Sequence, residues 1–363
     1  MEKSIVAIIK TNPQTVFADI AVLAEMAGMK QALKAETATI LKDNISWHLP
    51  FLSANTTPWQ LEGTIRALKA AGFNDLTAVH NNTVVTDVRK GLRLNKLADV
   101  YGRYGIPDKY NFLPGDMDWE IFRPRRKMRV LHRIYPEGIK IPAFFPGKNI
   151  VHLPTAKCHI YTTITGAMKN AFGGLLATRR YHTHSCIHET LVDLLAIQKE
   201  IHPGIFSLMD ATFCGNGPGP RTMIPVEKGL LLASADSVAL DAVAAKIMGF
   251  DPLGIGFIRM AHEDGLGMGR MEDIEVRGED IREMNFHFSV GNNLAGRVGR
   301  LIWYGPLQRF QRLFFHAPLL YLFIAGSYLY HDFVWWPLVG KRRMQAIVSS
   351  PWGKFFANYP ADQ

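Results

Sequence analysis

Apolar and amphipathic stretches alternate along the first two thirds of the chain. A short apolar run before Lys10 predicts a first strand. A helix is expected to begin at Thr57, because Thr57 can cap it, Pro58 suits its first turn and Gln60 can close a capping box. The apolar positions on one face of this helix, and the glycine that ends it, are Leu61, Ile65, Leu68 and Gly72. A strand is then expected at 76–79.

The central part of the chain continues this alternation. Strands are expected at 149–153, 205–209 and 230–233, and helices at 185–201 and 236–248. Strands that alternate with helices of this length predict a mostly parallel sheet, in which ligands bind at the carboxyl ends of the strands. Asp210 and Asp236 lie just past two of these strands, so we expect both carboxylates at that edge.

These elements predict an α/β fold. The 363 residues exceed what one hydrophobic core usually serves, and 48% hydrophobic with 20% charged residues is a globular composition. We expect two lobes with mostly parallel sheets flanked by helices, plus an aromatic-rich helical C-terminal extension. The expected boundaries are 1–110 for the first lobe, 111–150 for an irregular basic connecting segment, 151–290 for the second lobe and 291–363 for the extension.

The C-terminal extension contains a long apolar stretch. Residues 313–330 carry one strongly polar side chain, His316, and basic residues flank the stretch on both sides. An aromatic-rich segment with basic flanks is typical of a helix that lies in the membrane interface, so residues 309–343 are expected to contact a membrane. Other interpretations are a membrane span, a buried helix pair that covers the sheet, or a dimer contact. Four residues argue against a clean span: Pro318, His331, Asp332 and Pro337.

Charge and cysteine content narrow the function classes. The net charge of +9 favours anionic partners, namely phosphorylated ligands, nucleic acid or an anionic membrane. The basic cluster at 123–129 is either a contact surface or a solvated loop, and nucleic acid ranks last because no recognition motif accompanies it. The three cysteines form no Cys-x-x-Cys pair, which excludes a zinc ribbon or ferredoxin-like site. The apolar N-terminal run is too short for a signal peptide, so a cytoplasmic location is expected.

The densest group of chemically active side chains lies between residues 157 and 184. Lys157 and Lys169 can hold phosphate or carboxylate groups, and a desolvated Lys169 can act as a nucleophile. Gly173 and Gly174 allow a ligand to approach the backbone closely. The alternative is a basic surface loop with ordinary turn glycines.

Three histidines follow in this region. His184 and His188 are four residues apart on the stripe of Leu191 and Leu195, so both are predicted to point inward. A pair at this spacing can share a metal ion, although a satisfied core histidine or a catalytic histidine is favoured over a metal ligand. His182 precedes the helix and is the better choice for proton transfer.

The segment after Asp210 is rich in glycine. Gly215 and Gly217 follow an expected strand, where their backbone amides can form an anion-binding nest. The spacing matches neither the phosphate-binding loop of nucleotidases nor the dinucleotide fingerprint, so both classes are disfavoured.

Two further aspartates belong to the helix at 236–248. Asp236 either caps this helix or contributes to the site. Asp241 lies within an otherwise apolar helix, so an inward-facing carboxylate would need a partner such as Lys169 or Arg221.

These residues together resemble the domain-of-unknown-function family 362. The resemblance covers about residues 1–280 and is carried by 42–44, 57–58, 153–159, 165–173, His182, Asp210, Gly215, Gly217, Gly219 and 234–241. Members often read Lys-Pro-Asn where this chain has Asp43, and many carry a cysteine-rich ferredoxin-like module that this sequence lacks. A fainter similarity is to the lactate racemase family, whose nickel-pincer nucleotide is attached to a lysine. That similarity implies that Lys169 contacts a phosphorylated cofactor and that a histidine moves a proton.

We therefore predict an enzyme that acts on a phosphorylated or carboxylated anion in a cleft between the lobes. The alternative is a non-catalytic binding or assembly protein that docks on a membrane or partner through its C-terminal extension. The expected catalytic residues are Lys169, His182, His184 and Asp241. The expected ligand-binding residues are Lys157, His159, Thr165, Asn170, Asp210, Gly215, Gly217 and Asp236. The metal, the cofactor and the oligomeric state are left open.

Overall fold

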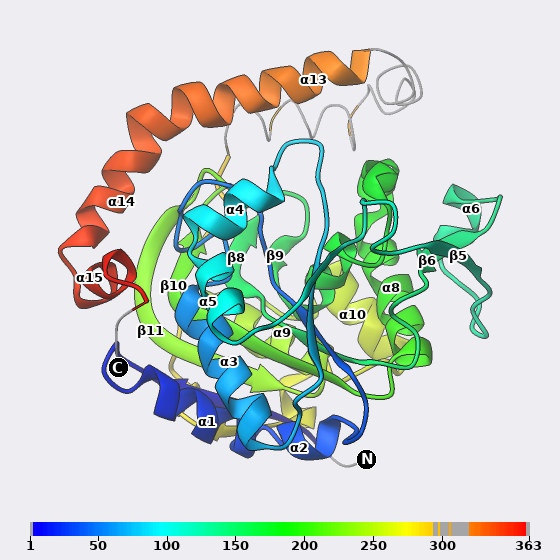
Figure 1. Cartoon of the computed structure of the whole chain (residues 1–363), viewed down its shortest axis with the longest axis horizontal. Coiled ribbons are helices and arrows are strands. Elements are labelled where there is room, and N and C mark those ends of the chain that lie inside the picture. Colours follow the sequence, from blue (N-terminus) through cyan, green and yellow to red (C-terminus); the bar gives the residue numbers. More distant parts are fainter. Residues whose placement is uncertain (1–2, 293–296, 298–304, 306–318, 361–363) are drawn as a thin grey trace.

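A ten-stranded sheet forms the centre of the computed structural model, which describes residues 3–292, 297, 305 and 319–360 (Figure 1). The strand order is β12-β1-β11-β10-β7-β2-β3-β4, and β8 pairs with both β10 and β9. The strands are β1 (Ser4–Lys10), β2 (Thr39–Lys42), β3 (Leu76–His80), β4 (Asp108–Tyr110), β7 (Asn149–His152), β8 (Thr155–His159), β9 (Thr163–Thr165), β10 (Ile205–Asn216), β11 (Ile224–Ser234) and β12 (Ile274–Gly278). Most neighbours are parallel, but β11 runs antiparallel to β1 and β10, and β9 runs antiparallel to β8.

Both halves of the chain contribute to this one sheet. The first strand, β1, pairs with β11 and β12, which lie more than 200 residues later. Strand β2 pairs with β7, with Ile40 opposite Ile150. The α/β class and the largely parallel sheet are therefore confirmed, whereas the structure shows one shared sheet in place of two lobes.

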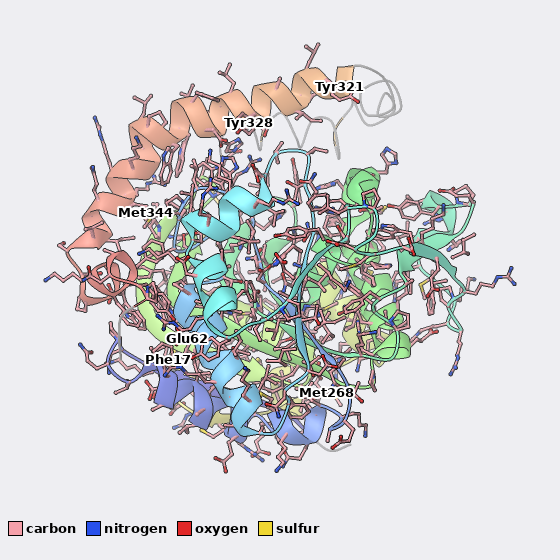
Figure 2. The ribbon with its side chains drawn as sticks, in the orientation of Figure 1. Phe17, Glu62, Met268, Tyr321, Tyr328 and Met344 are labelled. Atoms are coloured by element: carbon pink, nitrogen blue, oxygen red, sulfur yellow. The ribbon has the colours of Figure 1, made fainter. Side chains whose placement is uncertain are left out.

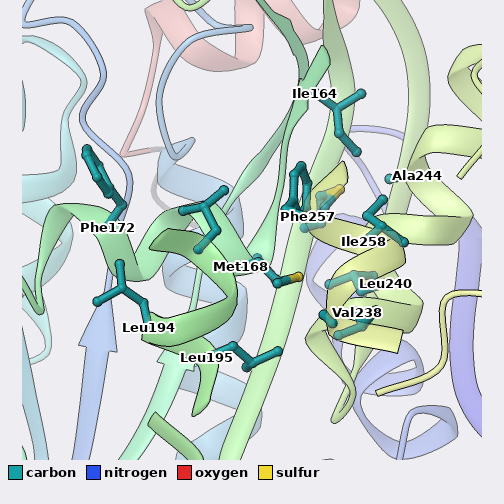
Figure 3. Close-up of a cluster of buried hydrophobic side chains, with 14 of the residues drawn as sticks. Ile164, Met168, Phe172, Leu194, Leu195, Val238, Leu240, Ala244, Phe257 and Ile258 are labelled. Atoms are coloured by element: carbon teal, nitrogen blue, oxygen red, sulfur yellow. The ribbon is translucent and has the colours of Figure 1, made fainter. Parts of the chain in front are cut away.

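Successive side chains along a strand point to opposite faces of the sheet, and each face packs against its own apolar layer. On β1, Val6 and Ile8 join one layer and Ala7 joins the other, as the two-residue period of a strand requires. Figure 3 shows part of the first layer, which includes Leu195 and Phe257. This layer is covered by α7 (Ala167–Asn170), α8 (Ile187–Ile201), α9 (Ser237–Met248) and α10 (Gly256–Glu263). The second is formed by α1 (Val16–Met26), α2 (Met29–Ala32), α3 (Pro58–Ala70), α4 (Val88–Leu94) and α5 (Leu97–Arg103).

The predicted helix ends are found where the sequence places them. Thr57 and Gln60 form the expected capping box at the start of α3. Gly72 follows the end of α3 with a φ of 96°, a left-handed conformation that suits glycine. Asp236 caps α9 and Gly249 ends it. These termini depend on short-range contacts, which the local sequence specifies.

Strand β10 is longer than predicted. It continues beyond Asp210 to Asn216, because residues after a bulge at Ala211/Phe213 pair with β11. Gly215 is therefore a strand residue opposite Pro225, and the prediction of a loop over this position is wrong. A side chain at Gly215 would collide with Met223, since a Cβ atom there would lie 2.4 Å from its sulfur.

The connecting segment is more regular than predicted. It contains a two-stranded sheet of β5 (Trp119–Phe122) and β6 (Ile139–Pro142), with the short helix α6 (Leu131–Ile134) between them. Arg129 forms two hydrogen bonds of 2.8 and 2.7 Å to the carboxylate of Asp264. This contact holds part of the basic cluster against the body of the protein.

The C-terminal extension forms a curved helical run over residues 319–348 (Figure 1). The run consists of α13 (Leu319–Tyr328), the π-helical segment η5 (Leu329–Gly340) and α14 (Lys341–Val348), and α15 (Pro351–Ala357) follows it. Figure 2 locates Tyr321, Tyr328 and Met344 along this arc. Within the described residues, no helix is both long and apolar enough to cross a membrane. Residues 313–318 of the predicted apolar stretch lie outside the described residues.

Aromatic contacts fasten this run to the body. The rings of Trp335 and Trp336 lie 5.8 and 5.3 Å from the ring of Trp47, whose Nε1 donates a 2.7 Å hydrogen bond to Asp332. Further along, Trp352 of α15 packs on Trp59 at 4.8 Å. The inner face of the run is therefore a packed interface with the first half of the chain.

Candidate functional site

A cavity of about 620 Å³ lies between the edge of the sheet and the helical run 319–348. Residues at or just past the carboxyl ends of the parallel strands β2, β3 and β7 line it, among them Lys42, Asn81 and Pro154. This is the edge at which α/β sheets bind ligands. The predicted cleft between lobes is thus replaced by a cavity whose roof is part of the C-terminal extension.

The cavity collects five of the twelve predicted site residues. Those that line it are His159, Thr165, Lys169, Asn170 and His184. Those that do not are Lys157, His182, Asp210, Gly215, Gly217, Asp236 and Asp241. The roles predicted for all twelve remain predictions, and the structure adds where each one lies.

Lys157 is buried beside the cavity rather than exposed in it. Its Nζ donates a 2.5 Å hydrogen bond to the carbonyl oxygen of Ala54. Burial, and then the nearby charge of Lys169, hold the pKa of Lys157 well below its usual value. A buried amine that donates to a carbonyl supports the loop at Ala54.

Asp210 and Asp236 have structural contacts outside the cavity. Asp210 lies within β10 and accepts hydrogen bonds from the hydroxyl of Thr57 and from the amide of Thr212, and burial raises its pKa. Asp236 follows β11, whose antiparallel direction carries it to the opposite edge of the sheet, where it accepts from Val238 and Ala239 at the start of α9. The expectation that both carboxylates share the ligand edge is therefore wrong.

Asp241 supports the segment that carries Lys169. Its carboxylate accepts hydrogen bonds of 2.6 and 3.1 Å from the backbone amides of Ala167 and Met168 at the start of α7. The expected lysine or arginine partner is replaced by these two amides, and burial raises the pKa of Asp241 to about 7. Gly166 permits this approach, because a Cβ atom there would lie 1.9 Å from the carboxylate.

Lys169 and Arg180 form a cationic pair on the cavity wall. The charged ends of both side chains lie over the ring of Phe172, at 5.5 and 5.7 Å from its centre. Burial and the charge of Arg180 lower the pKa of Lys169 to about 8. Burial lowers the pKa of Arg180 to about 10, and its guanidinium donates a 2.9 Å hydrogen bond to the carbonyl oxygen of Asn82.

Asp43 belongs to a buried network next to this pair. Lys42 donates a 2.6 Å hydrogen bond from Nζ to the backbone oxygen of Asp43, while His80 and Tyr101 contact the carboxylate at 3.2 and 3.1 Å. Burial alone would raise the pKa of Asp43, but the contacts with His80 and Lys42 outweigh it and hold the pKa below its usual value. The carboxylate is thus ionised and committed to partners within the protein. Asn170 completes the network by donating to the carbonyl oxygen of Lys42 at 2.8 Å.

The roof adds polar groups that were not among the twelve predicted site residues. Arg221 donates a 3.2 Å hydrogen bond to the hydroxyl of Ser327, and burial lowers its pKa to about 10. His331 lies within 2.7 Å of the carbonyl oxygen of Ser327, and burial lowers its pKa to about 3, so the ring is neutral. The signal available in the sequence was the spacing of Ser327 and His331, four residues apart in an apolar stretch.

The histidines of the predicted pair face different surroundings. His184 lines the cavity, whereas His188 stacks on Phe257 and accepts a 3.1 Å hydrogen bond from its amide. Across the part of the chain that the structure describes, no group of three or more His, Cys, Asp or Glu side chains is arranged to hold a metal ion. Cys158, Cys186 and Cys214 are free thiols. Lys169 and His184 both line the cavity, whereas His182 does not.

The charge on the cavity wall is predominantly positive. Among the described residues that line it, the cationic side chains are Lys42, Lys169, Arg180 and Arg221, and the carboxylate is that of Asp43. Aliphatic and aromatic side chains complete the wall, among them Ile45, Val85, Tyr161 and Phe172. The arrangement therefore combines cationic donors with apolar surface in one enclosed volume.

Comparison with known proteins places this geometry in a family. The model of the domain of unknown function DUF362 matches residues 39–246, which include β2 through β11 and therefore the strand ends that line the cavity. The chain belongs to the DUF362 family. Residues 42–44 and six residues of 165–173, two segments that carry the resemblance in the sequence, line the cavity of this DUF362 protein. The helical run 319–348, which supplies the roof, lies outside the matched range.

This DUF362 protein is also similar to a curated relative. It is 33% identical over 126 residues to a thylakoid-associated protein of Synechocystis sp., a match that covers 33% of this chain and 37% of that protein. The chain thus spans little more than a third of the relative that it matches. No solved structure matches the chain.

Proposed function

We propose that this DUF362 protein is an enzyme that binds a phosphorylated or carboxylated anion in the cavity beneath the helical run. The observation that carries the proposal is the excess of cationic side chains over carboxylates on the cavity wall. Enclosing more cations than carboxylates costs folding free energy, because the excess charge loses contact with water. An anionic ligand would neutralise this excess charge and so bind favourably.

Lys169 is the residue best suited to move a proton on such a ligand. Its pKa of about 8 lies close to neutral pH, where a general acid or base is most effective. Asp241 acts on it indirectly, because it fixes the first turn of α7 through Ala167 and Met168. His184 lines the same cavity and is the second proton-transfer residue of the proposal.

Calorimetric titration of the full chain with inorganic phosphate and with succinate tests this proposal. Loss of one charge-assisted contact costs about 1.5–3 kcal/mol, so Lys169→Met should weaken binding by about tenfold to a hundredfold. The matched control is Lys199→Met, which removes an exposed lysine in the last turn of α8. If neither phosphate nor succinate binds to the wild type, the proposal is refuted.

The pH dependence provides a second test of the same site. Lys169 carries its charge below a pKa of about 8, so anion affinity should fall as pH rises from 7 to 9.5. The decrease in anion affinity that is due to deprotonation of Lys169 should be absent in Lys169→Met. Mass spectrometry of small molecules released by denaturation should identify an anion that co-purifies with the wild type and is depleted in the variant.

The outer face of the helical run favours a second function, docking on an anionic membrane surface. Tyr321, Leu329, Phe333 and Leu338 are 73%, 60%, 65% and 59% exposed along this face, and α14 begins with two exposed basic residues at 341–342. The acidic residue of the run, Asp332, turns inward to Trp47. Apolar side chains followed by basic ones suit insertion at a lipid interface, and the name of the thylakoid-associated relative agrees with this reading.

Flotation with lipid vesicles tests this second function. The full chain should float with vesicles of phosphatidylcholine and phosphatidylglycerol and less with phosphatidylcholine alone, because basic residues add attraction to anionic lipid. Phe333→Asp should reduce flotation, whereas Ile121→Asp, at an exposed apolar position on β5, should not. Equal flotation of both variants and the wild type would exclude docking through this face.

A further inference from the structure

The helical run forms the boundary between two hollows. Ile324 and Gly326 line the cavity, and they also line an outer hollow of about 520 Å³ that is otherwise walled by apolar and aromatic residues of the run. Leu322 is 68% exposed and yet lines the cavity, so the cavity reaches the surface at this helix. Its mouth therefore lies on the side of the protein that carries the exposed apolar face.

A glycine, Gly326, lies on this boundary and lines both hollows. Among the described residues, a Cβ atom built on Gly326 would meet no other atom within 4 Å, so there is open space on the side where a side chain would project. A helix does not need glycine at such a position, and alanine would favour the helix by about 1 kcal/mol per residue in general. The absence of a side chain leaves space between the two hollows.

The interior of the cavity is amphipathic. Its charged groups include Lys169 and Arg180 at the ring of Phe172. Its apolar groups include Leu322, Phe323 and Ile324, which all come from the helix at the mouth. A ligand that satisfies both surfaces has an anionic end and an apolar portion.

We propose that the ligand of this cavity is an anionic amphiphile that enters from a lipid bilayer through the mouth beside Gly326. The proposal rests on the proposed function and specifies its ligand class. The apolar outer face would hold the mouth at the membrane surface. The apolar portion of the ligand would then remain in contact with lipid or with the helical run while the anionic end reaches Lys169 and Arg180.

The first measurement is how the binding affinity depends on the length of the alkyl chain of the ligand. The full chain is titrated with inorganic phosphate, butyl phosphate and dodecyl phosphate, the last kept below its micelle concentration. Each methylene removed from water strengthens binding by about fourfold, so butyl phosphate should bind at least tenfold more tightly than inorganic phosphate, and dodecyl phosphate more tightly again. Lys169→Met should weaken all three, because they share the anionic end.

The mouth is tested by a matched pair of variants. Gly326→Trp should fill the space between the hollows and weaken dodecyl phosphate binding by at least tenfold, while inorganic phosphate binds as in the wild type. Gly326→Ala should bind all three as the wild type does. Circular dichroism establishes that both variants fold.

The source of the ligand is tested with vesicles. Uptake of dodecyl phosphate from vesicles of phosphatidylcholine and phosphatidylglycerol is followed through tryptophan fluorescence. Leu338→Asp, at an exposed apolar position of the run that lines neither hollow, should slow this uptake at least tenfold and leave the affinity for free dodecyl phosphate unchanged. Equal uptake by Leu338→Asp and the wild type would place the source in water and overturn entry from the bilayer.

The failures can be told apart. If neither the phosphates nor succinate binds, the proposed function itself is refuted. If the three phosphates bind with equal affinity, the anion site stands and the amphiphile is overturned. If dodecyl phosphate binds tightly and Gly326→Trp has no effect on it, the mouth beside Gly326 is overturned.

Discussion

Asp241→Asn should change how the stability of this protein depends on pH. Burial raises the pKa of Asp241 to about 7 in the folded chain, against an ordinary value of 3.8. The folded state therefore holds the proton more tightly than the unfolded state, and the wild type loses stability as pH rises from about 4 to 7. The slope for one proton is about 1.4 kcal/mol per pH unit, so about 2–3 kcal/mol should be lost between pH 5 and 8.

The asparagine variant isolates this effect. Its amide oxygen can still accept a hydrogen bond from Ala167 or Met168, but it does not titrate. Urea unfolding of both proteins between pH 5 and 8 should therefore show the variant gaining about 2–3 kcal/mol on the wild type as pH rises. Asp241→Ala is the contrast, because two buried amides without acceptors cost about 1–3 kcal/mol each at every pH. A constant difference between wild type and Asp241→Asn would refute the raised pKa.

Two further substitutions test the packing of the chain. Trp352→Ala removes a buried ring from its contact with Trp59 and should lower the free energy of unfolding by about 3–5 kcal/mol, measured in urea, whereas the exposed Val348→Ala should change it little. Lys157→Met should stabilise the protein at pH 7, because burial holds the pKa of Lys157 well below 10.5 and the unfolded chain binds the extra proton. This gain in stability should shrink as pH rises toward 10.5. Thermal unfolding of both proteins at pH 7 and pH 10 measures it, and a larger gain at pH 10 than at pH 7 would contradict the reasoning.

Local sequence was informative wherever a structure depends on neighbouring residues. The capping box at Thr57 and the cap at Asp236 follow from side chains that reach backbone amides two or three residues away. Lys169 and Asn170, which were selected from the dense group of polar residues near Gly173 and Gly174, both line the cavity. The chemistry predicted for them remains to be tested.

Predictions from local sequence were wrong where the structure depends on pairing between distant strands. A strand end does not reveal which edge of a sheet it occupies, so Asp236 was expected beside the ligand although β11 runs antiparallel to its neighbours. Gly215 suggested a loop, but pairing with β11 makes it part of a strand. Asp241 was given a basic side-chain partner, and the fold instead supplied two backbone amides.

The sequence by itself determined the α/β class, the ends of several helices and the family. Only the tertiary structure decided that both halves share one sheet and that Arg221, Ser327 and His331 meet at the roof of one cavity. The physical reason is separation along the chain. Helix caps form within one turn, whereas this roof requires the helical run to pack on Trp47, about 285 residues before Asp332, and no local pattern encodes that contact.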